Sequence, residues 1–365
     1  MKTSESDNYT GQLRNGREIQ KKKNISKYYP PAIEISSSAI KLLQLCQTRH
    51  NVYEPARFAY LPFEQRVVSA AVIRGALEKL VWENSLSGEV VSSLSMAELQ
   101  TFTYIFPDMP ASEIEPAVIW KLKQNPPAGI EFGNLAFDYV SSASVLTKGL
   151  CVLVFAVSRE AVIERSKLFR EFSLSLISLE PKPYAVLQAL FWSKSIAKDE
   201  TVLVLQIGAQ QSVVSVIYNG FPCLIRSLNV CGNTLTDSLA KQNQLDWQQA
   251  EDLKKMPGSA ALAIGSQTTA FWLAASGPAL SSQLESLSLD IEHSFKYFSH
   301  QLIKSPLVSF RRLILCGGAA QLAGLDKFLA QRLAVNVEVF HSPLISENVS
   351  DFTSALGLAV RHIEK

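Results

Sequence analysis

Short apolar runs that end at small residues recur along this 365-residue chain. In residues 32–45, alternating apolar positions are interrupted by serines at 36–38. This pattern predicts a β-hairpin with Glu34 on its first strand and Lys41 on its second. Residues 201–220 repeat the arrangement around Gly208, and an Asn-Gly pair there predicts a turn into a third strand. The chain is therefore expected to contain the same hairpin twice, about 170 residues apart.

A third apolar run, residues 313–316, ends at Gly317 and Gly318 and is followed by a predicted helix with Asp326 in its first turn. A turn without side chains before a helix N-terminus lets a phosphate or a flat ring approach the backbone closely. The same joint also occurs where backbones only pack tightly. Two hairpins that face each other across a cleft, together with this turn, predict a duplicated architecture that holds the phosphate tail of a nucleotide.

Two helices are predicted from apolar residues spaced three and four positions apart. The longer one carries a continuous apolar stripe from Leu280 to Leu302, which predicts a face buried in the core rather than a cofactor site. The shorter one begins near Ser112, because Ser112 and Glu115 match a capping box. Its apolar positions 114, 118 and 122 are expected to point inward.

Composition indicates a globular protein without a strong overall field, since 47% of the residues are apolar, 19% are charged and the net charge is +2. The first 30 residues hold seven basic and three acidic residues and little apolar periodicity, which predicts a disordered basic tail. Such a tail is either simply solvated or contacts an anionic partner or a membrane surface. The longest uncharged stretch, residues 256–284, is interrupted by glycine, proline and polar residues, so no transmembrane helix is expected.

The cysteines and histidines do not match a metal site. The five cysteines contain no C-x-x-C pair and lie mostly in apolar runs, which favours reduced thiols in a protein core. His293 and His300 are two helical turns apart, too far to share a zinc ion. The chain also lacks a Walker A sequence and a G-x-S-x-G elbow, so neither a P-loop protein nor a serine hydrolase is indicated.

These motifs, in this order, resemble those of the actin-like ATPase superfamily, and within it the PilM family of type IV pilus assembly proteins, which is related to FtsA and to the cytoplasmic domain of GspL. Residues 32–41 resemble the family's first phosphate loop, residues 203–209 its second, and residues 317–325 its adenosine loop. The resemblance covers residues 32–362. It implies an α/β actin-like ATPase fold, with two duplicated lobes around a nucleotide cleft and an inserted small α/β subdomain.

The resemblance also implies a nucleotide site. The residues that match its nucleotide-binding positions are Ser36, Ser37, Ser38, Lys41, Gly208, Ala209, Gln210, Gly232, Glu251, Lys254, Asp290, His293, Gly317, Gly318 and Ala319. Asp290 and His293 stand where relatives place residues for the ribose and the adenine, although a simple exposed pair explains them equally well. Glu34 and Gln206 stand where relatives have two aspartates that hold a magnesium ion through its waters. Glu180 stands where chaperone-like relatives orient the attacking water.

Departures from the family pattern affect the expected chemistry. Gln206 lacks the negative charge that magnesium prefers, and Ser36 adds a side chain where the backbone must approach phosphates. A degenerate ATPase that binds ATP or ADP with weak or absent hydrolysis is therefore expected. Two alternatives remain open: a working ATPase in which Glu34 and Glu180 suffice, and a structural subunit of the same fold that binds no nucleotide. A sugar kinase of this fold is less well supported, because the sequence shows no motif for a sugar site.

The expected domains are a basic tail (1–30), a first lobe (31–85 and 158–199), an inserted subdomain (86–157) and a second lobe (200–365), whose smaller subdomain spans about 256–305. The resemblance implies a cytoplasmic scaffold, peripheral at the inner face of the bacterial inner membrane. Its expected partner is a single-span PilN-like protein, bound by its cytoplasmic N-terminal segment in a groove that involves the inserted subdomain. Other pilus components and self-association are further expected contacts, and nucleic acid is not.

Overall fold

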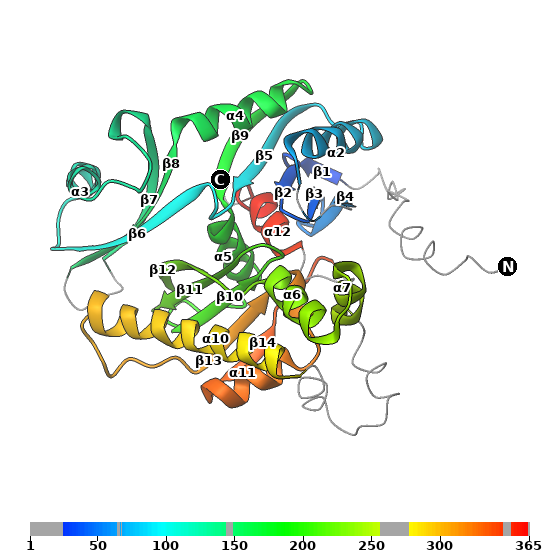
Figure 1. The fold of residues 1–365 in the computed structure, drawn as a ribbon. Helices are drawn as coiled ribbons and strands as arrows, with labels where there is room; N and C mark the ends of the chain where they lie inside the picture. The colour runs from blue at the N-terminus through cyan, green and yellow to red at the C-terminus, as the bar shows by residue number, and fades with distance from the viewer. Residues whose placement is uncertain are drawn as a thin grey trace. The chain divides into compact units, whose positions relative to one another are not determined.

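The computed structural model describes residues 25–63, 66, 68–143, 149–255, 277–345 and 352–363. The chain divides into two compact units. Unit 1 comprises residues 1–95, 159–193 and 342–365, and unit 2 comprises residues 96–158 and 194–341. The described residues form three β-sheets, one in unit 1 and two in unit 2 (Figure 1).

The sheet of unit 1 combines three antiparallel strand pairs with two parallel pairs. Strand β3 pairs antiparallel with β1, β2 and β4, while β2 pairs parallel with β5 and β5 parallel with β9. The strands are β1 (Ile25–Tyr28), β2 (Ala32–Ile35), β3 (Ala39–Thr48), β4 (Tyr53–Pro62), β5 (Gly88–Leu94) and β9 (Leu174–Pro181). The helices of this unit are α2 (Ala70–Glu83), α4 (Arg159–Arg170), α5 (Lys182–Trp192) and α12 (Thr353–Val360).

Apolar side chains from both β2 and β3 form the core of unit 1 with helices α2 and α4. Ile33 and Ile40 of the hairpin pack in one cluster with Leu77 of α2 and Phe169 of α4. Helices α5 and α12 pack against each other, and α12 also contacts β2 and β3. All eight residues of α12 are buried, which its continuous apolar and small-residue sequence permits.

The larger sheet of unit 2 repeats the topology of unit 1. Its strand order is β12-β11-β10-β13-β14, with antiparallel pairs up to β10 and parallel pairs from β10 to β14. The strands are β10 (Val202–Ile207), β11 (Ser212–Tyr218), β12 (Phe221–Leu228), β13 (Arg312–Cys316) and β14 (Asn336–Val339). In unit 1 the order β4-β3-β2-β5-β9 has the same directions, so the predicted duplication of the hairpin extends to a whole sheet.

Helices surround this second sheet (Figure 1). They are α6 (Gly232–Asn243), α7 (Trp247–Lys255), α10 (Gly277–Lys296) with its π-helical continuation η2 (Tyr297–Leu302), the 3₁₀ turn η3 (Gly318–Gln321) and α11 (Leu325–Leu333). The stripe predicted for the long helix is confirmed, because Leu280, Leu287 and Phe298 are fully buried in the core of the unit.

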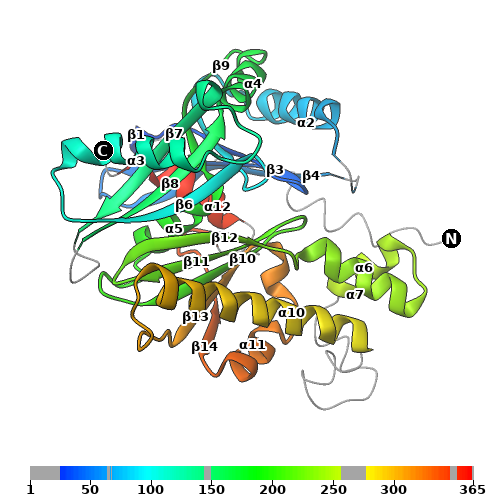
Figure 2. The same ribbon diagram turned by 60° about the vertical axis from the view of Figure 1, so that its left-hand side comes forward.

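A small three-stranded sheet with one helix forms the rest of unit 2 (Figure 2). Its elements are β6 (Leu99–Phe106), α3 (Ala111–Gln124), η1 (Phe132–Asn134), β7 (Leu135–Ser142) and β8 (Leu150–Ser158), in the sheet order β6-β8-β7. The Thr101 and Thr103 hydroxyls donate to the carbonyl oxygens of Ile225 (2.7 Å) and Cys223 (2.6 Å) on β12. These bonds connect β6 to the edge strand β12 through side chains, and the two strands remain in separate sheets.

The structure corrects several predicted boundaries. Residues 25–28, predicted as part of a disordered tail, form β1 on the edge of the first sheet, whereas residues 1–24 lie outside the described residues. Strand β5, predicted in the inserted subdomain, pairs with β2 and β9 and belongs to the first sheet. Helix α12, predicted in the second lobe, packs on α5 in unit 1. In each case the pairing partner is distant in sequence, so the local pattern could not reveal it.

Two further predictions concern local features. Helix α3 begins at Ala111 and its N-cap residue, Pro110, makes no side-chain capping bond, so the predicted capping box was wrong. The inward positions Ile114, Val118 and Leu122 are confirmed as buried. All five cysteines are free and buried, as predicted for core thiols. Of the smaller subdomain predicted at about 256–305, residues 256–276 lie outside the described residues.

Candidate functional site

In unit 2, the second hairpin and the Gly-Gly turn lie side by side. Strands β10 and β13 are parallel neighbours with Gln206 opposite Cys316, so the loops that follow them start at the same edge of the sheet (Figure 1). Gly317 has φ +89°, and a Cβ atom on it would lie 2.5 Å from the carbonyl oxygen of Ile207. Only glycine fits this close approach of the two loops.

The start of helix α6 is anchored on the second hairpin. The backbone N–H of Gly232 donates to the carbonyl oxygen of Gly208 (2.8 Å), and that of Asn233 donates to Ala209 (2.7 Å). A Cβ atom on Gly232 would lie 3.1 Å from the same Gly208 oxygen, so the absence of a side chain allows this packing. Three of the loops predicted to contact nucleotide are thus brought together in one unit.

Helix α7 adds a charged cluster beside this anchor. The ammonium group of Lys254 donates to the Gly232 carbonyl (3.0 Å), to Thr236 (2.7 Å) and to Glu251 Oε2 (2.6 Å). Lys255 pairs with the other oxygen of Glu251 at 3.2 Å. Burial raises the pKa of Glu251, but its bonds with Lys254 and Thr236 outweigh burial and lower it. Burial lowers the pKa of Lys254, an effect that Glu251 opposes. This cluster fixes α7 against the start of α6.

The remaining predicted residues of unit 2 differ in accessibility. Gln210 and Gly318 are exposed and Ala319 is half-buried, so the tips of both loops are open to solvent within the unit. His293 is exposed and Asp290 is half-buried on helix α10. Neither of these two side chains makes a hydrogen bond or an ion pair with another described residue. The structure therefore places the glycine loops together and leaves the role predicted for Asp290 and His293 without support from contacts.

In unit 1, the carboxylate of Glu34 is enclosed by two ammonium groups. Lys41, its cross-strand partner on β3, lies 3.5 Å from Oε2, and Lys182, the first residue of α5, lies 2.7 Å from Oε1. Glu34 is completely buried. Burial raises its pKa, but the charges of Lys182 and Lys41, with help from Ser354, outweigh burial and lower the pKa to about 2.

The three-serine turn of the first hairpin is closed by its own first side chain. The Ser36 hydroxyl accepts from the backbone N–H groups of Ser38 (3.3 Å) and Ala39 (3.0 Å) and donates to the Ala39 carbonyl (2.8 Å). Ser36, Ser37 and Ser38 are all half-buried. The two amides that a phosphate oxygen could use therefore already have an acceptor, Ser36 Oγ.

Glu180, the candidate for orienting a water molecule, is also held by neighbours in unit 1. Its Oε1 accepts from Ser178 Oγ (2.6 Å) and from Arg361 Nε (3.0 Å), which follows helix α12. Glu180 is 8% exposed. Both contacts are made to Oε1, so the other oxygen of the carboxylate, Oε2, is the one that a water molecule could approach.

The type IV pilus assembly protein PilM family matches residues 32–362 of the chain. The chain belongs to this family. The structure of a "PilM-PilN type IV pilus biogenesis complex" is similar, with a TM-score of 0.73 and 25% identity, over 92% of this chain and 99% of that chain. These findings confirm the predicted family and its actin-like fold.

More distant structures agree with the fold. The ethanolamine utilization protein EutJ from Carboxydothermus hydrogenoformans has a TM-score of 0.54 and 14% identity, over 92% of this chain and 90% of that one. MreB5 of Spiroplasma citri bound to ADP has a TM-score of 0.50 and 12% identity, over 92% and 99%. No curated protein matches the chain by sequence.

The residues at the two positions where the PilM family pattern has magnesium-binding aspartates do not fit a magnesium ion. Glu34 is already compensated by two lysines, and Gln206, half-buried at the end of β10, is uncharged. Nowhere in the described part of the chain do three or more His, Cys, Asp or Glu side chains gather as they would around a metal ion. The charges that compensate Glu34 and Glu180 come from Lys182 and Arg361, which sequence reasoning missed. Only their position directly after a matched motif could have indicated them.

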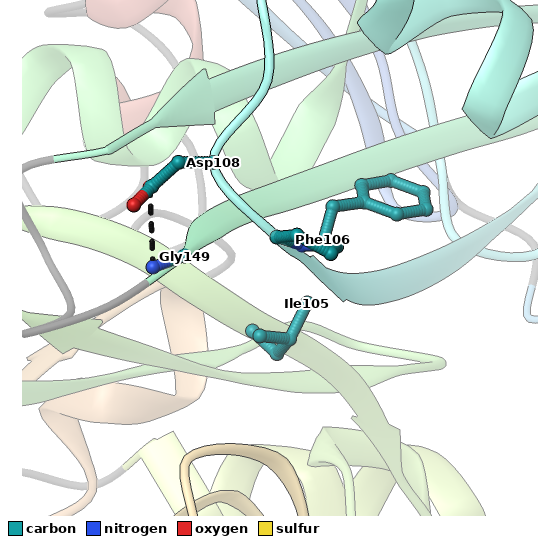
Figure 3. Close-up of a pocket in the computed structure, with 5 residues that line it drawn as sticks. Ile105, Phe106, Asp108 and Gly149 are labelled. Carbon is teal, nitrogen blue, oxygen red and sulfur yellow. Dashed lines mark hydrogen bonds between the residues drawn. The ribbon is translucent and has the colours of Figure 1, made fainter.

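A separate pocket lies at the end of the small sheet of this PilM-family chain (Figure 3). It is lined by Ile105, Phe106, Pro107, Asp108 and Gly149, with the Asp108 carboxylate accepting from the Gly149 N–H at 3.2 Å. None of the predicted site residues belongs to it. Among the described residues, no helix combines the length and the apolar character needed to cross a bilayer.

Proposed function

We propose that this chain is a cytoplasmic scaffold of type IV pilus assembly, peripheral at the inner membrane, that binds ATP or ADP as a structural ligand and hydrolyses it weakly or not at all. It docks the cytoplasmic N-terminal segment of a single-span inner-membrane protein of the PilN kind. The observation that carries the proposal is the family match over residues 32–362, together with the similarity to a complex whose name pairs PilM with PilN.

Nucleotide binding is supported by the glycine loops of unit 2. Gly208, Gly232 and Gly317 remove side chains where three backbone segments meet, while Gln210 and Gly318 leave the loop tips accessible. Backbone of this kind at the ends of parallel strands suits a phosphate or a ribose. Lys254 and Glu251 are fixed beside Gly232, where they can contact the sugar.

Weak or absent hydrolysis is supported by charge and by hydrogen bonding. Gln206 carries no negative charge for a metal ion, and Glu180 is held by Arg361 and Ser178. Both of these contacts hold the carboxylate through Oε1, which restricts the orientation in which Oε2 could direct an attacking water molecule. The retained chemistry is therefore binding, with the nucleotide acting on the conformation of the scaffold.

Calorimetry with ADP and ATP on the full chain tests nucleotide binding. Gly318→Asp places a carboxylate at the exposed loop tip and is expected to weaken binding at least about tenfold through repulsion of the phosphates. Gly133→Asp is the matched control, because Gly133 is exposed, has no atom near the added Cβ and lies in the 3₁₀ turn η1 that precedes β7. Bound nucleotide at 100 times its dissociation constant should also stabilise the fold by about 2.7 kcal/mol in a melting experiment.

The two alternatives make different predictions. A chain that gains no thermal stability from any adenine nucleotide is a nucleotide-free structural subunit. Magnesium-dependent phosphate release that disappears in Glu180→Ala identifies a working ATPase. Docking is tested separately by fluorescence anisotropy with a labelled synthetic peptide of the N-terminal cytoplasmic segment of the PilN-like protein from the same genome, and a peptide of scrambled sequence is the control. Equal binding of both peptides contradicts specific docking.

A further inference from the structure

The first hairpin of unit 1 carries a buried charge cluster that supplies its own cations. Glu34 and Lys41 face each other as a cross-strand pair, and Lys182 reaches the same carboxylate from the start of α5. The Glu34 side chain is 0% exposed, that of Lys41 4% and that of Lys182 19%. At this depth one carboxylate faces two ammonium groups, so the charge of Glu34 is already compensated within the protein.

A divalent cation at the Glu34 carboxylate would add two positive charges next to the ammonium groups of Lys41 and Lys182. Magnesium binds strongly only where anionic oxygens outnumber nearby cations, and it requires near-octahedral oxygen ligands or waters. The Lys182 ammonium already lies at hydrogen-bond distance from Oε1 (2.7 Å), so a metal-bound water would have to compete with it for this oxygen. Repulsion between like charges in a buried position is also poorly screened.

The turn next to Glu34 also contains its own hydrogen-bond partner, the hydroxyl of Ser36. Ser36 Oγ accepts from the Ser38 and Ala39 amides and donates to the Ala39 carbonyl, so these three backbone groups already have a partner inside the turn. In the other unit, the residue at the equivalent position of β10 is Gln206, which has no charge to be compensated. Neither hairpin therefore presents an uncompensated carboxylate to a metal ion.

We propose that Lys182 takes the place of a divalent cation beside Glu34, and that this chain binds adenine nucleotide without magnesium. The nucleotide part rests on the function proposed above, while the exclusion of a cation from Glu34 does not. The consequence is a scaffold whose nucleotide occupancy does not require magnesium.

Two measurements on the full chain test this inference. The first is calorimetry of ADP binding in magnesium chloride and in EDTA. The second is electron paramagnetic resonance of Mn²⁺, titrated with and without ADP, on the wild type, Lys182→Met and the control Lys79→Met. Lys79 is an exposed lysine of unit 1, paired with Glu83 at 3.9 Å, so its replacement removes the same charge away from Glu34.

The wild type is expected to bind ADP at least as tightly in EDTA as in magnesium chloride, since magnesium only competes for the ADP phosphates, and to bind no Mn²⁺ at the protein. Lys182→Met should acquire a Mn²⁺ site that the further change Glu34→Gln removes, and Lys79→Met should behave as the wild type. A wild type that loses about tenfold or more of its ADP affinity in EDTA overturns the inference. So does Mn²⁺ that binds the wild type and is lost in Glu34→Gln.

The two proposals can fail separately. If ADP binds in neither buffer, the nucleotide function fails, while the manganese titration without nucleotide still decides whether Glu34 takes a cation. If Lys182→Met does not fold, the wild type and the double variant Glu34→Gln/Lys182→Met, which removes the carboxylate charge together with one ammonium, carry the test.

Discussion

Helices α5 and α12 of unit 1 approach each other closely at Gly357, and replacing this residue with alanine tests how α12 packs. A Cβ atom on Gly357 would lie 1.6 Å from the carbonyl oxygen of Ala185 and 2.4 Å from its carbonyl carbon. Cβ atoms in proteins essentially never approach another atom closer than 3.0 Å. The two helices must therefore separate, because the atom in the way belongs to the backbone of α5 and cannot rotate aside.

The expected cost follows from what surrounds the contact. Overpacking a core costs about 1–3 kcal/mol and more where the neighbours cannot move. Every residue of α12 is buried and the helix also contacts β2 and β3, so a shift disturbs several contacts at once. Alanine regains about 1 kcal/mol through its better helix propensity. We expect Gly357→Ala to lose about 3 kcal/mol of unfolding free energy in total.

Urea unfolding followed by circular dichroism measures the effect, and Gly75→Ala is the matched control. Gly75 lies inside helix α2 of the same unit, is exposed, and has no atom within 4 Å of an added Cβ. The control should gain about 0.5–1 kcal/mol from helix propensity alone. If Gly357→Ala stays within about 1 kcal/mol of the wild type, the two helices do not pack as closely as described.

Three further predictions concern charge and hydrogen bonding. Unfolding free energy should fall by about 3 kcal/mol as the pH drops from about 4.5 towards 2, because the unfolded chain takes up a proton at Glu34 before the folded chain, whose pKa is about 2, can do so. Urea midpoints against pH check this, and Glu34→Gln should flatten the curve. Replacing Thr101 and Thr103 together with valine should cost about 2 kcal/mol and speed hydrogen exchange in β12, since two buried carbonyls lose their donors. Lys254→Met should lower the melting temperature and weaken ADP binding, whereas Lys255→Met, at a side chain that is 66% exposed, should change both little.

Local sequence patterns were sufficient for the two hairpins and the long helix of this fold. Alternating apolar residues with small turns predicted both hairpins, and the spacing from Leu280 to Leu302 predicted the buried stripe of α10. These features depend on residues within one or two turns of each other, so the sequence determines them directly. The sequence predicted only that the hairpin is duplicated. That the strand order of the whole sheet is duplicated could be established only from the strand pairing in the structure.

Assignments that depend on distant partners were the ones that sequence could not provide. The apolar run of β5 could have paired with the small sheet, and its actual neighbours, β2 and β9, are separated from it by long connections. Glu34 and Glu180 were recognised by their place in a motif, but their charge environment depends on Lys182 and Arg361, which other helices supply. A side chain's type predicts which chemistry is available, and its neighbours decide which part of that chemistry is retained.

The two hairpins depart in different ways from the two aspartates that the family pattern has at these positions. In β10 the charged position is occupied by Gln206, and no counter-ion is needed. In β2 the charge of Glu34 is retained, and burying it without compensation would be costly, so Lys182 and Lys41 accompany it. Glu180 is likewise compensated by Arg361. In unit 1, Glu34 and Glu180 are held in internal ion pairs, whereas unit 2 has glycine loops with accessible tips. Unit 2 is therefore the part of the chain better suited to contact a ligand.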